Sequence, residues 1–208
     1  MHLQRSDGQA TLFDKTHGVP FIWGDTPLTV ELKWKGGVQR RSSIQGFWIE
    51  HLLTGDSQVI MDDDDANESA DVVEFFFDEL EITCRLYHCK YAGGDEPGLR
   101  VSDVQVVCAQ AVRSAKWADA PLALINHLQL REDSSRRGGR PTRFEKGGLQ
   151  LLSMIKRLLP HRRFNLQIYV VQPGLALSDI DRNVSLVLGA SDNFVQELTG
   201  YPLTVVGS

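Results

Sequence analysis

The sequence predicts a mixed α/β fold in which helices flank a central β-sheet. Short runs of alternating or continuously apolar residues, typical of strands, are interspersed with longer stretches whose apolar residues recur every three or four positions. With 208 residues, of which 42% are hydrophobic and 24% charged, the chain can build one substantial core. No internal repeat divides it, so we treat residues 1–208 as one domain.

The first predicted elements are a hairpin and a helix. Residues 20–36 alternate apolar and polar side chains around "GDTP", which indicates a β-hairpin and makes residues 1–41 an N-terminal hairpin extension. Residues 42–55 read "SSIQGFWIEHLLTG". A serine can cap a helix there, Ile44 and Trp48 fall on one face, and the glycine can end it.

Three strands and a second helix follow. We expect strands at residues 57–61, 71–77 and 81–92, the first two joined by the acidic loop "DDDDANES" and the last two by the tight turn "DELE". After the loop "GGDEPG", residues 101–117 carry an apolar stripe at helical spacing in spite of their valines. These elements and the preceding helix form a predicted catalytic core at residues 42–117.

The second half, residues 118–208, is expected to supply further helices and the strands that complete the sheet. Its predicted elements are a helical region at 121–130, a flexible basic loop at 131–143, a long helix at 144–159, a strand at 164–174, a short helix at 193–200 and a last strand at 202–208.

Acidic and basic residues are segregated along the chain, although the net charge is only −5. From Glu50 to Glu81 there are twelve acids and no lysine or arginine. From Arg131 to Arg163 there are ten basic residues against three acids, a local excess of seven positive charges. An acidic pocket for a divalent cation beside a basic surface for phosphates is what metal-dependent phosphodiester chemistry requires. The alternative is two solvated faces of a stable fold.

Several other classes of protein find no support in the sequence. No run of about 18 uncharged apolar residues is present, and the N-terminal residues lack the apolar stretch of a secretory signal, which predicts a cytoplasmic protein without a membrane segment. Cys84, Cys89 and Cys108 are at no metal-ligand spacing, which predicts reduced, buried thiols. No glycine-rich phosphate loop or nucleophile motif indicates an enzyme acting on a small molecule.

One predicted strand ends on polar side chains that share a face. Residues two apart on a strand point the same way, so His88 and Lys90 lie on one side and Cys89 on the other, which excludes a thiol–imidazole pair of Cys89 and His88. A hairpin partner that begins at Asp71 brings its carboxylate near His88 and Lys90. We therefore expect a cluster of one carboxylate, one imidazole and one ammonium.

The stretch "ESADVV…LYHCKYAGG…RVSDVQVVCAQAVRS" resembles the catalytic core of the PD-(D/E)xK superfamily, the restriction-endonuclease-like nucleases, and especially its variants in antiviral defence and restriction systems. In that family an Asp opens one strand and a (Glu/Asp/Gln)-x-Lys triplet lies on the next. An acid often comes from a preceding helix, and a following helix carries a Gln. The resemblance covers residues 43–117 and implies a restriction-endonuclease-like central mixed sheet flanked by helices.

Carried over residue by residue, the resemblance implies a catalytic set. Asp71 matches the Asp, Lys90 the lysine, Glu50 the helical acid and Gln110 the helix glutamine, while His88 departs from the pattern at the first position of the triplet. Asp71, His88 and Glu50 would hold Mg²⁺ or Mn²⁺, because a neutral imidazole can also ligate a metal. Lys90 would orient or deprotonate the attacking water.

The implied function is a metal-dependent nuclease that acts on DNA in preference to RNA. It would be the effector domain of a larger antiviral defence or restriction system, with a helicase, an ATPase or another subunit as partner. Four arginines of the basic loop would contact the phosphate backbone without reading sequence: Arg136, Arg137, Arg140 and Arg143. The alternative is a catalytically inactive nuclease-like module that binds nucleic acid or protein, which the histidine in the triplet favours.

Each of these residues also has a purely structural interpretation. Asp71 is then a strand-entry acid and Lys90 a lysine that reaches water from a strand end. His88 is a hydrogen-bonded core histidine. Glu50 and Gln110 are polar residues on the exposed edges of their helices.

The acidic loop upstream of Asp71 has two interpretations as well. Four adjacent acids, Asp62 to Asp65, repel one another unless counter-ions are held. Either the loop is solvated, or one of these acids, or Glu68, reaches a metal at Asp71.

Overall fold

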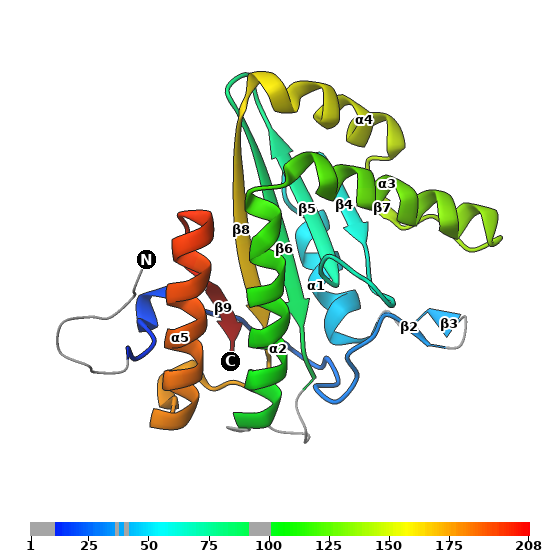
Figure 1. Ribbon diagram of the computed structural model, residues 1–208. Coiled ribbons are helices and arrows are strands. Elements are labelled where there is room, and N and C mark those ends of the chain that lie inside the picture. Colours follow the sequence, from blue (N-terminus) through cyan, green and yellow to red (C-terminus); the bar gives the residue numbers. More distant parts are fainter. Residues whose placement is uncertain (1–10, 36–37, 40–41, 92–100) are drawn as a thin grey trace.

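The structure is a computed structural model that describes residues 11–35, 38–39, 42–91 and 101–208. Within these residues the centre of the molecule is a mixed seven-stranded sheet with the strand order β1-β9-β8-β6-β5-β4-β7 (Figure 1). Its strands are β1 (Gly18–Pro20), β4 (Val59–Asp62), β5 (Val72–Phe77), β6 (Glu81–Cys89), β7 (Phe144–Lys146), β8 (Arg163–Val171) and β9 (Thr204–Gly207). A separate two-stranded piece pairs β2 (Trp34–Lys35) with β3 (Val38–Gln39).

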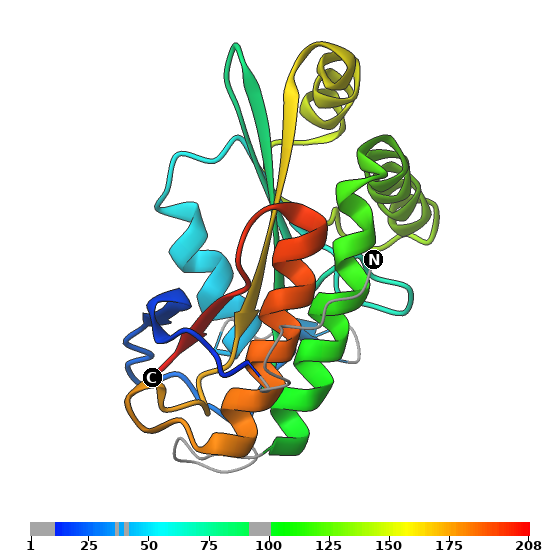
Figure 2. The same ribbon diagram turned by 60° about the vertical axis from the view of Figure 1, so that its left-hand side comes forward.

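Helices cover both faces of this sheet. They are α1 (Ile44–Leu53), α2 (Val101–Ser114), α3 (Pro121–Arg137), α4 (Leu149–Leu158) and α5 (Arg182–Thr199), with short 3-10 turns η1 (Lys15–His17), η2 (Ala115–Ala118), η3 (Leu159–His161) and η4 (Leu177–Asp179). Figure 2 shows α1 on one face and α2 and α5, packed against each other, on the opposite face. The mixed α/β class with a helix-flanked central sheet is thus confirmed.

The direction of pairing changes at β6. Strands β4, β5 and β6 form an antiparallel meander, in which Val72 of β5 lies opposite Tyr87 of β6. Beyond β6 the pairing is parallel, from β6 to β8, β9 and β1. Parallel neighbours need crossover connections, and the helices α2 to α4 and then α5 provide them. The last part of the chain therefore contributes β8 and β9 to the main sheet.

Two apolar clusters hold these layers together. The larger one lies between the sheet and α2 and α5, and Leu86 of β6 belongs to it. The smaller one lies between the sheet and α1, and it takes Tyr87 and Cys89, the residues of β6 that face the other way. The three cysteines are buried and unpaired, as the sequence predicted.

The hairpin predicted over residues 20–36 is wrong. No strand is formed between β1 and β2, and the chain turns at Gly24, whose φ of +55° suits glycine. The alternating residues that follow do not pair as strands. Instead, the carbonyl oxygens of Val30 and Glu31 accept hydrogen bonds from the N–H groups of the first two residues of α1. Residues 1–41 are also more than an extension, since β1 is the edge strand of the main sheet.

Three further elements differ from prediction in the second half. The short helix predicted at 193–200 is the end of the longer helix α5, which begins at Arg182. The basic segment 131–143 is not all loop, because α3 continues to Arg137 with Glu132 and Ser135 buried on its inner face. The predicted helix at 144–159 begins only at Leu149, because residues 144–146 pair with β4 as β7. The predicted turn at Gly36 and Gly37 and the predicted loop at 93–98 lie outside the described residues.

No helix in the described part of the chain combines the length and the apolar character needed to cross a membrane.

Candidate metal site

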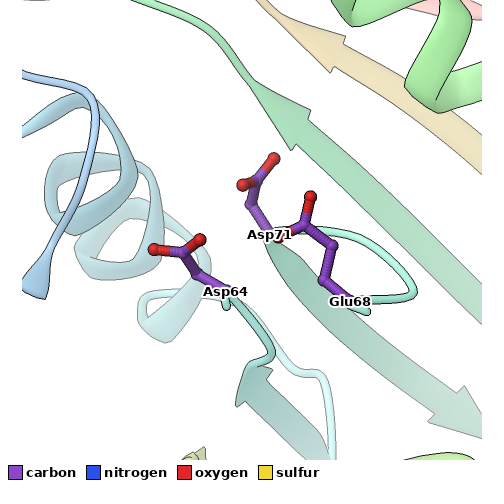
Figure 3. Close-up of side chains that lie close together, drawn as sticks. All are labelled: Asp64, Glu68 and Asp71. Carbon is purple, nitrogen blue, oxygen red and sulfur yellow. The ribbon is translucent and has the colours of Figure 1, made fainter. Parts of the chain in front are cut away.

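Three carboxylates converge where the loop after β4 leads into β5. Asp64, Glu68 and Asp71, which we call the acid group, each offer an oxygen, and these three oxygens lie within 4.8 Å of one another. Figure 3 shows Asp64 and Glu68 rising from the loop and Asp71 standing at its end, just before the strand. Asp71 is buried and the other two are half-buried. Carboxylate oxygens at this spacing are the ligands that Mg²⁺ and Mn²⁺ prefer.

Backbone hydrogen bonds fix the position of Asp71. Its Oδ2 accepts a hydrogen bond of 2.7 Å from the backbone N–H of Cys89, at the end of β6. The antiparallel pairing of β5 with β6 places these two backbones side by side. An acid immediately before a central strand is thereby held against the neighbouring strand rather than released to solvent.

The rest of the loop is folded by its own acids. Asp63 is fully buried, accepts hydrogen bonds from the N–H and hydroxyl of Ser69, and forms an ion pair with Arg131 of α3. Asp65 and Asn67 have positive φ angles of 146° and 66°, which turn the chain back toward β5. The loop therefore has a defined conformation with a buried acid, and this corrects the interpretation of the four aspartates as a solvated loop.

Burial and mutual repulsion raise the pKa values of these carboxyl groups. Burial, followed by the negative charges of Glu68, Glu31 and Asp65, raises the pKa of Asp64 to about 6. Burial also raises the pKa of Asp71 well above its usual range, with the charge of Glu68 as the next cause. A bound divalent cation would offset both causes, so the donor set and its electrostatics fit Mg²⁺ or Mn²⁺.

Helix α1 reaches the site through Gln45. Its Nε2 donates hydrogen bonds to Asp62 Oδ1 at 3.1 Å and to the carbonyl of Asp71 at 3.3 Å. Beside it the buried Lys33 forms an ion pair with Glu145, and its Nζ lies 3.7 Å from Asp62 Oδ2. Burial raises the pKa of Asp62 to about 6 despite this lysine.

The predicted helical acid, Glu50, is not brought to the carboxylates. It is exposed and lies five residues after Gln45, about 7.5 Å farther along the helix axis. It is not one of the three acids that converge in the described residues.

The predicted helix glutamine does reach the site. Gln110 Nε2 donates a hydrogen bond of 3.2 Å to Glu68 Oε1. Its own Oε1 is buried without a hydrogen-bond partner. Gln110 is thus in contact with the acid group, from the opposite face of the sheet to α1.

Lys90 is connected to the acid group through a residue that sequence reasoning missed. Its Nζ lies 2.9 Å from Glu31 Oε2, which also accepts the backbone N–H of Tyr91 at 2.9 Å. The same Glu31 carboxylate acts on the pKa values of Asp64 and Asp71. Glu31 is 59 positions from Lys90 in the chain, and no local pattern marks it.

His88 is bonded to a residue of α2, and no hydrogen bond between its side chain and Asp71 or Lys90 is found in the described residues. It is 2% exposed, and its Nε2 is 2.9 Å from Ser114 Oγ of α2. Burial, with the charge of Arg113 as a second cause, lowers its pKa to about 3, so the ring is neutral. No hydrogen bond or ion pair among the described residues joins Asp71 to His88 or Lys90. The side chains of the expected three-residue cluster thus have separate partners: Cys89 N–H for Asp71, Ser114 for His88 and Glu31 for Lys90.

The four predicted phosphate-binding arginines have different surroundings. Arg143 is largely buried and donates to the carbonyl oxygens of Asp62 and Asp64. Arg140 is half-exposed and pairs with Asp65 at 3.1 Å. Arg136 and Arg137, in the last turn of α3, are exposed to solvent.

A pocket of about 580 Å³ adjoins the acid group on the α2 side. Glu68 and Gln110 line it together with His88 and the cations Arg113 and Lys116. Trp117 and His127 form a further wall, with ring centroids 5.6 Å apart. The sequence analysis did not single out Arg113, Lys116, Trp117 or His127.

The chain matches no protein-family model, and neither a curated protein nor a solved structure is significantly similar to it. The argument for function therefore depends on the site.

Proposed function

We propose that the protein is a Mg²⁺- or Mn²⁺-dependent nuclease that acts on DNA. The observation that carries the proposal is the convergence of Asp64, Glu68 and Asp71, whose oxygens lie within 4.8 Å of one another. Asp71 is also the residue that matches the catalytic Asp of the motif. Metal-dependent phosphodiester hydrolysis uses a divalent cation held by carboxylates. The fold then corresponds to the restriction-endonuclease-like arrangement that the resemblance implies.

The order of elements around the site supports this proposal. From α1 onward the chain forms a helix, three antiparallel strands and a second helix. The parallel strand β8 comes next in the sheet, after the intervening elements η2, α3, β7, α4 and η3. Asp71 precedes the central strand of the meander, Lys90 follows the last one, and Gln110 comes from the next helix. This is the succession in which the family places its Asp, its lysine and its helix glutamine.

The residues of the chain divide the chemical work. Asp64, Glu68 and Asp71 would hold the cation, which when bound lowers the pKa of a water molecule and neutralises charge on the scissile phosphate. The Cys89 N–H group fixes Asp71 and Gln110 fixes Glu68, so two of the three ligands are held in place before binding. The ammonium of Lys90, steadied by Glu31, is placed to stabilise negative charge on the phosphate oxygens.

The decisive experiment is cleavage of plasmid and single-stranded DNA with Mg²⁺ or Mn²⁺. Asp71→Asn and Lys90→Ala are each expected to lower the rate by about 10²-fold or more, because each removes a group that acts on the reacting phosphate. Glu197→Gln, which removes an exposed carboxylate of α5, is the matched control and should cleave like the wild type. Full activity in Lys90→Ala would contradict the assignment of Lys90 as a group that acts on the reacting phosphate.

A second candidate is a nuclease-like module that binds nucleic acid or protein without cleaving it. The observation in its favour is His88, which replaces the triplet carboxylate and is bonded to Ser114 rather than to the acid group. Calorimetry with Mn²⁺ separates the two functions. DNA binding without any Mn²⁺ binding that depends on Asp71 would favour the module.

A further inference from the structure

Two residues that line the pocket beside the acid group, His88 and Gln110, carry buried polar atoms without a hydrogen-bond partner among the described residues. Ser114 Oγ lies 2.8 Å from the carbonyl oxygen of Ser69 and 3.1 Å from that of Gln110. Carbonyl oxygens only accept, so when the single hydroxyl proton goes to one of them, His88 Nε2 is the donor to Ser114 Oγ at 2.9 Å. The neutral ring then has an unprotonated Nδ1, which is buried without a partner. Gln110 Oε1 is a second buried acceptor without a partner, because the amide donates through Nε2 to Glu68.

Two such acceptors on the lining of one pocket call for a ligand that carries N–H donors. A buried polar group without a hydrogen bond costs about 1–3 kcal/mol, and a ligand with an amino group would recover part of that cost. The pocket volume of about 580 Å³ is within the usual range for small-molecule sites. His88 is 2% exposed, so its orientation is set by the fold and not by solvent.

The rest of the lining has the chemistry of a phosphate and aromatic-base site. Arg113 and Lys116 are exposed cations on its rim. Trp117 and His127 provide ring surface on which a base can stack, and Lys116 Nζ lies 4.7 Å from the centre of the Trp117 ring. Asp65, the other acid of the lining besides Glu68, is neutralised by Arg140.

We propose that this pocket holds one unpaired nucleotide of the substrate strand. An amino-bearing base meets the acceptor atoms of His88 and Gln110, and the adjoining phosphate meets Arg113 and Lys116. The inference rests on the proposed function, because Glu68 belongs both to the pocket and to the acid group, so that a strand held here passes the metal site. A paired base cannot enter the pocket without leaving its helix, which costs a few kcal/mol, so the preferred substrate is single-stranded or locally opened DNA.

Binding is tested without metal, so that it is independent of cleavage. Calorimetry in EDTA compares dAMP, dIMP, which lacks the amino group, and inorganic phosphate. We expect dAMP to bind about tenfold more tightly than either of the others, and pentadeoxyadenylate to compete for the same site. The double variant Arg113→Ala/Lys116→Ala should bind dAMP at least about tenfold more weakly. Both residues are exposed, so this variant should fold.

Two control proteins make the outcome specific. Arg157→Ala removes an exposed cation of α4 that does not line the pocket and should leave dAMP binding unchanged. Asp71→Asn should bind dAMP like the wild type and cleave nothing. Binding of dAMP without cleavage by the wild type contradicts the proposed function but supports the pocket as a nucleotide site.

Three results overturn the inference even if the protein cleaves DNA. The first is dAMP binding no tighter than phosphate binding, and the second is a double variant that binds like the wild type. The third is dAMP binding for which pentadeoxyadenylate does not compete, which indicates a free nucleotide as the ligand. Cleavage assays supply an independent readout, because the double variant should lose the preference of the wild type for single-stranded over duplex DNA.

Discussion

Asp64 belongs to the acid group and has a pKa close to neutral pH. Its pKa, raised to about 6 by burial and neighbouring carboxylates, leaves part of the population protonated below that pH. A protonated carboxyl must release its proton before it ligates a cation. We therefore expect Mn²⁺ affinity to rise as the pH increases through 6 and to level off above it, in calorimetric titrations between pH 5 and pH 8.

The matched variants for this prediction are Asp64→Asn and His88→Gln. Asp64→Asn should bind Mn²⁺ more weakly and with a shallower dependence on pH. His88→Gln should keep the pH dependence, because the pKa of His88, lowered to about 3, places its titration outside this range. A pH dependence that disappears in His88→Gln instead would assign the metal to the imidazole.

Burial of Asp71 disfavours its charged form, and this has a consequence for stability. The pKa of Asp71 in the folded chain is raised above its ordinary value of about 3.9. Between these two pKa values the folded chain binds more protons than the unfolded chain. The contribution of Asp71 to stability therefore falls as the pH rises from the ordinary pKa to the raised one. Asp71→Asn should therefore raise the melting temperature of the metal-free protein at pH 7. The gain should shrink toward pH 4, and saturating Mn²⁺ should reverse it by stabilising only the wild type.

The loop between β4 and β5 depends on arginines from a distant part of the chain. Arg131 of α3 pairs with the fully buried Asp63 and also donates to the carbonyl oxygens of Asp63 and Ala66. Arg143 donates to the carbonyls of Asp62 and Asp64. The loop that carries Asp64 and Glu68 is thus attached to α3 and to the residue just before β7.

Removing Arg131 should loosen this loop. Arg131→Ala leaves Asp63 buried without its cation, and such a loss costs about 3–5 kcal/mol of unfolding free energy. The same variant should weaken Mn²⁺ binding, because Asp64 and Glu68 lose their support. Arg137→Ala, on the exposed side of the same helix, should change stability by less than about 0.5 kcal/mol. Equal losses of unfolding free energy in the two variants, measured by urea unfolding, would show that the ion pair of Arg131 with Asp63 does not stabilise the protein.

The acidic and basic segments, separated in the sequence, meet in the folded molecule. Arg131, Arg140 and Arg143 neutralise the acidic loop, so much of the local basic excess is used internally. Neither of the two interpretations of the charge pattern included this one, in which the segments serve as counter-ions for each other. The basic residues of the predicted phosphate-binding set that remain fully available to a ligand are Arg136 and Arg137.

Salt dependence tests whether these two arginines hold a phosphate backbone. The logarithm of DNA affinity should fall linearly with the logarithm of salt concentration, and Arg136→Ala/Arg137→Ala should flatten the slope by up to about 2. The loss should be similar for two unrelated duplexes, because phosphate contacts carry no sequence information. Arg182→Ala, at the exposed start of α5, is the control. An unchanged slope in the double variant would leave these arginines without a role in DNA binding.

Local patterns in the sequence were sufficient to predict α1, β4, β5 and β6. Helical spacing and a capping serine predicted α1, and Ser43 does cap it by accepting from the N–H of Gly46. Alternating and apolar runs predicted β4, β5 and β6, because side-chain periodicity reports which face is buried. The acid before β5 and the glutamine of α2, both singled out from the sequence, lie close to Glu68 in the structure, because the meander and the following helix fix where they lie.

Other features depended on contacts between distant segments. Alternation predicted a common face for His88 and Lys90, but β6 ends at Cys89, and beyond that residue Lys90 turns to Glu31. β7 was hidden in a helical pattern because its pairing with β4 joins residues more than 80 positions apart. Glu31, Gln45 and the arginines of the acidic loop carry no local signal. Buried charge must find its partner wherever the fold brings one within reach, and only the tertiary structure decides which residue that is.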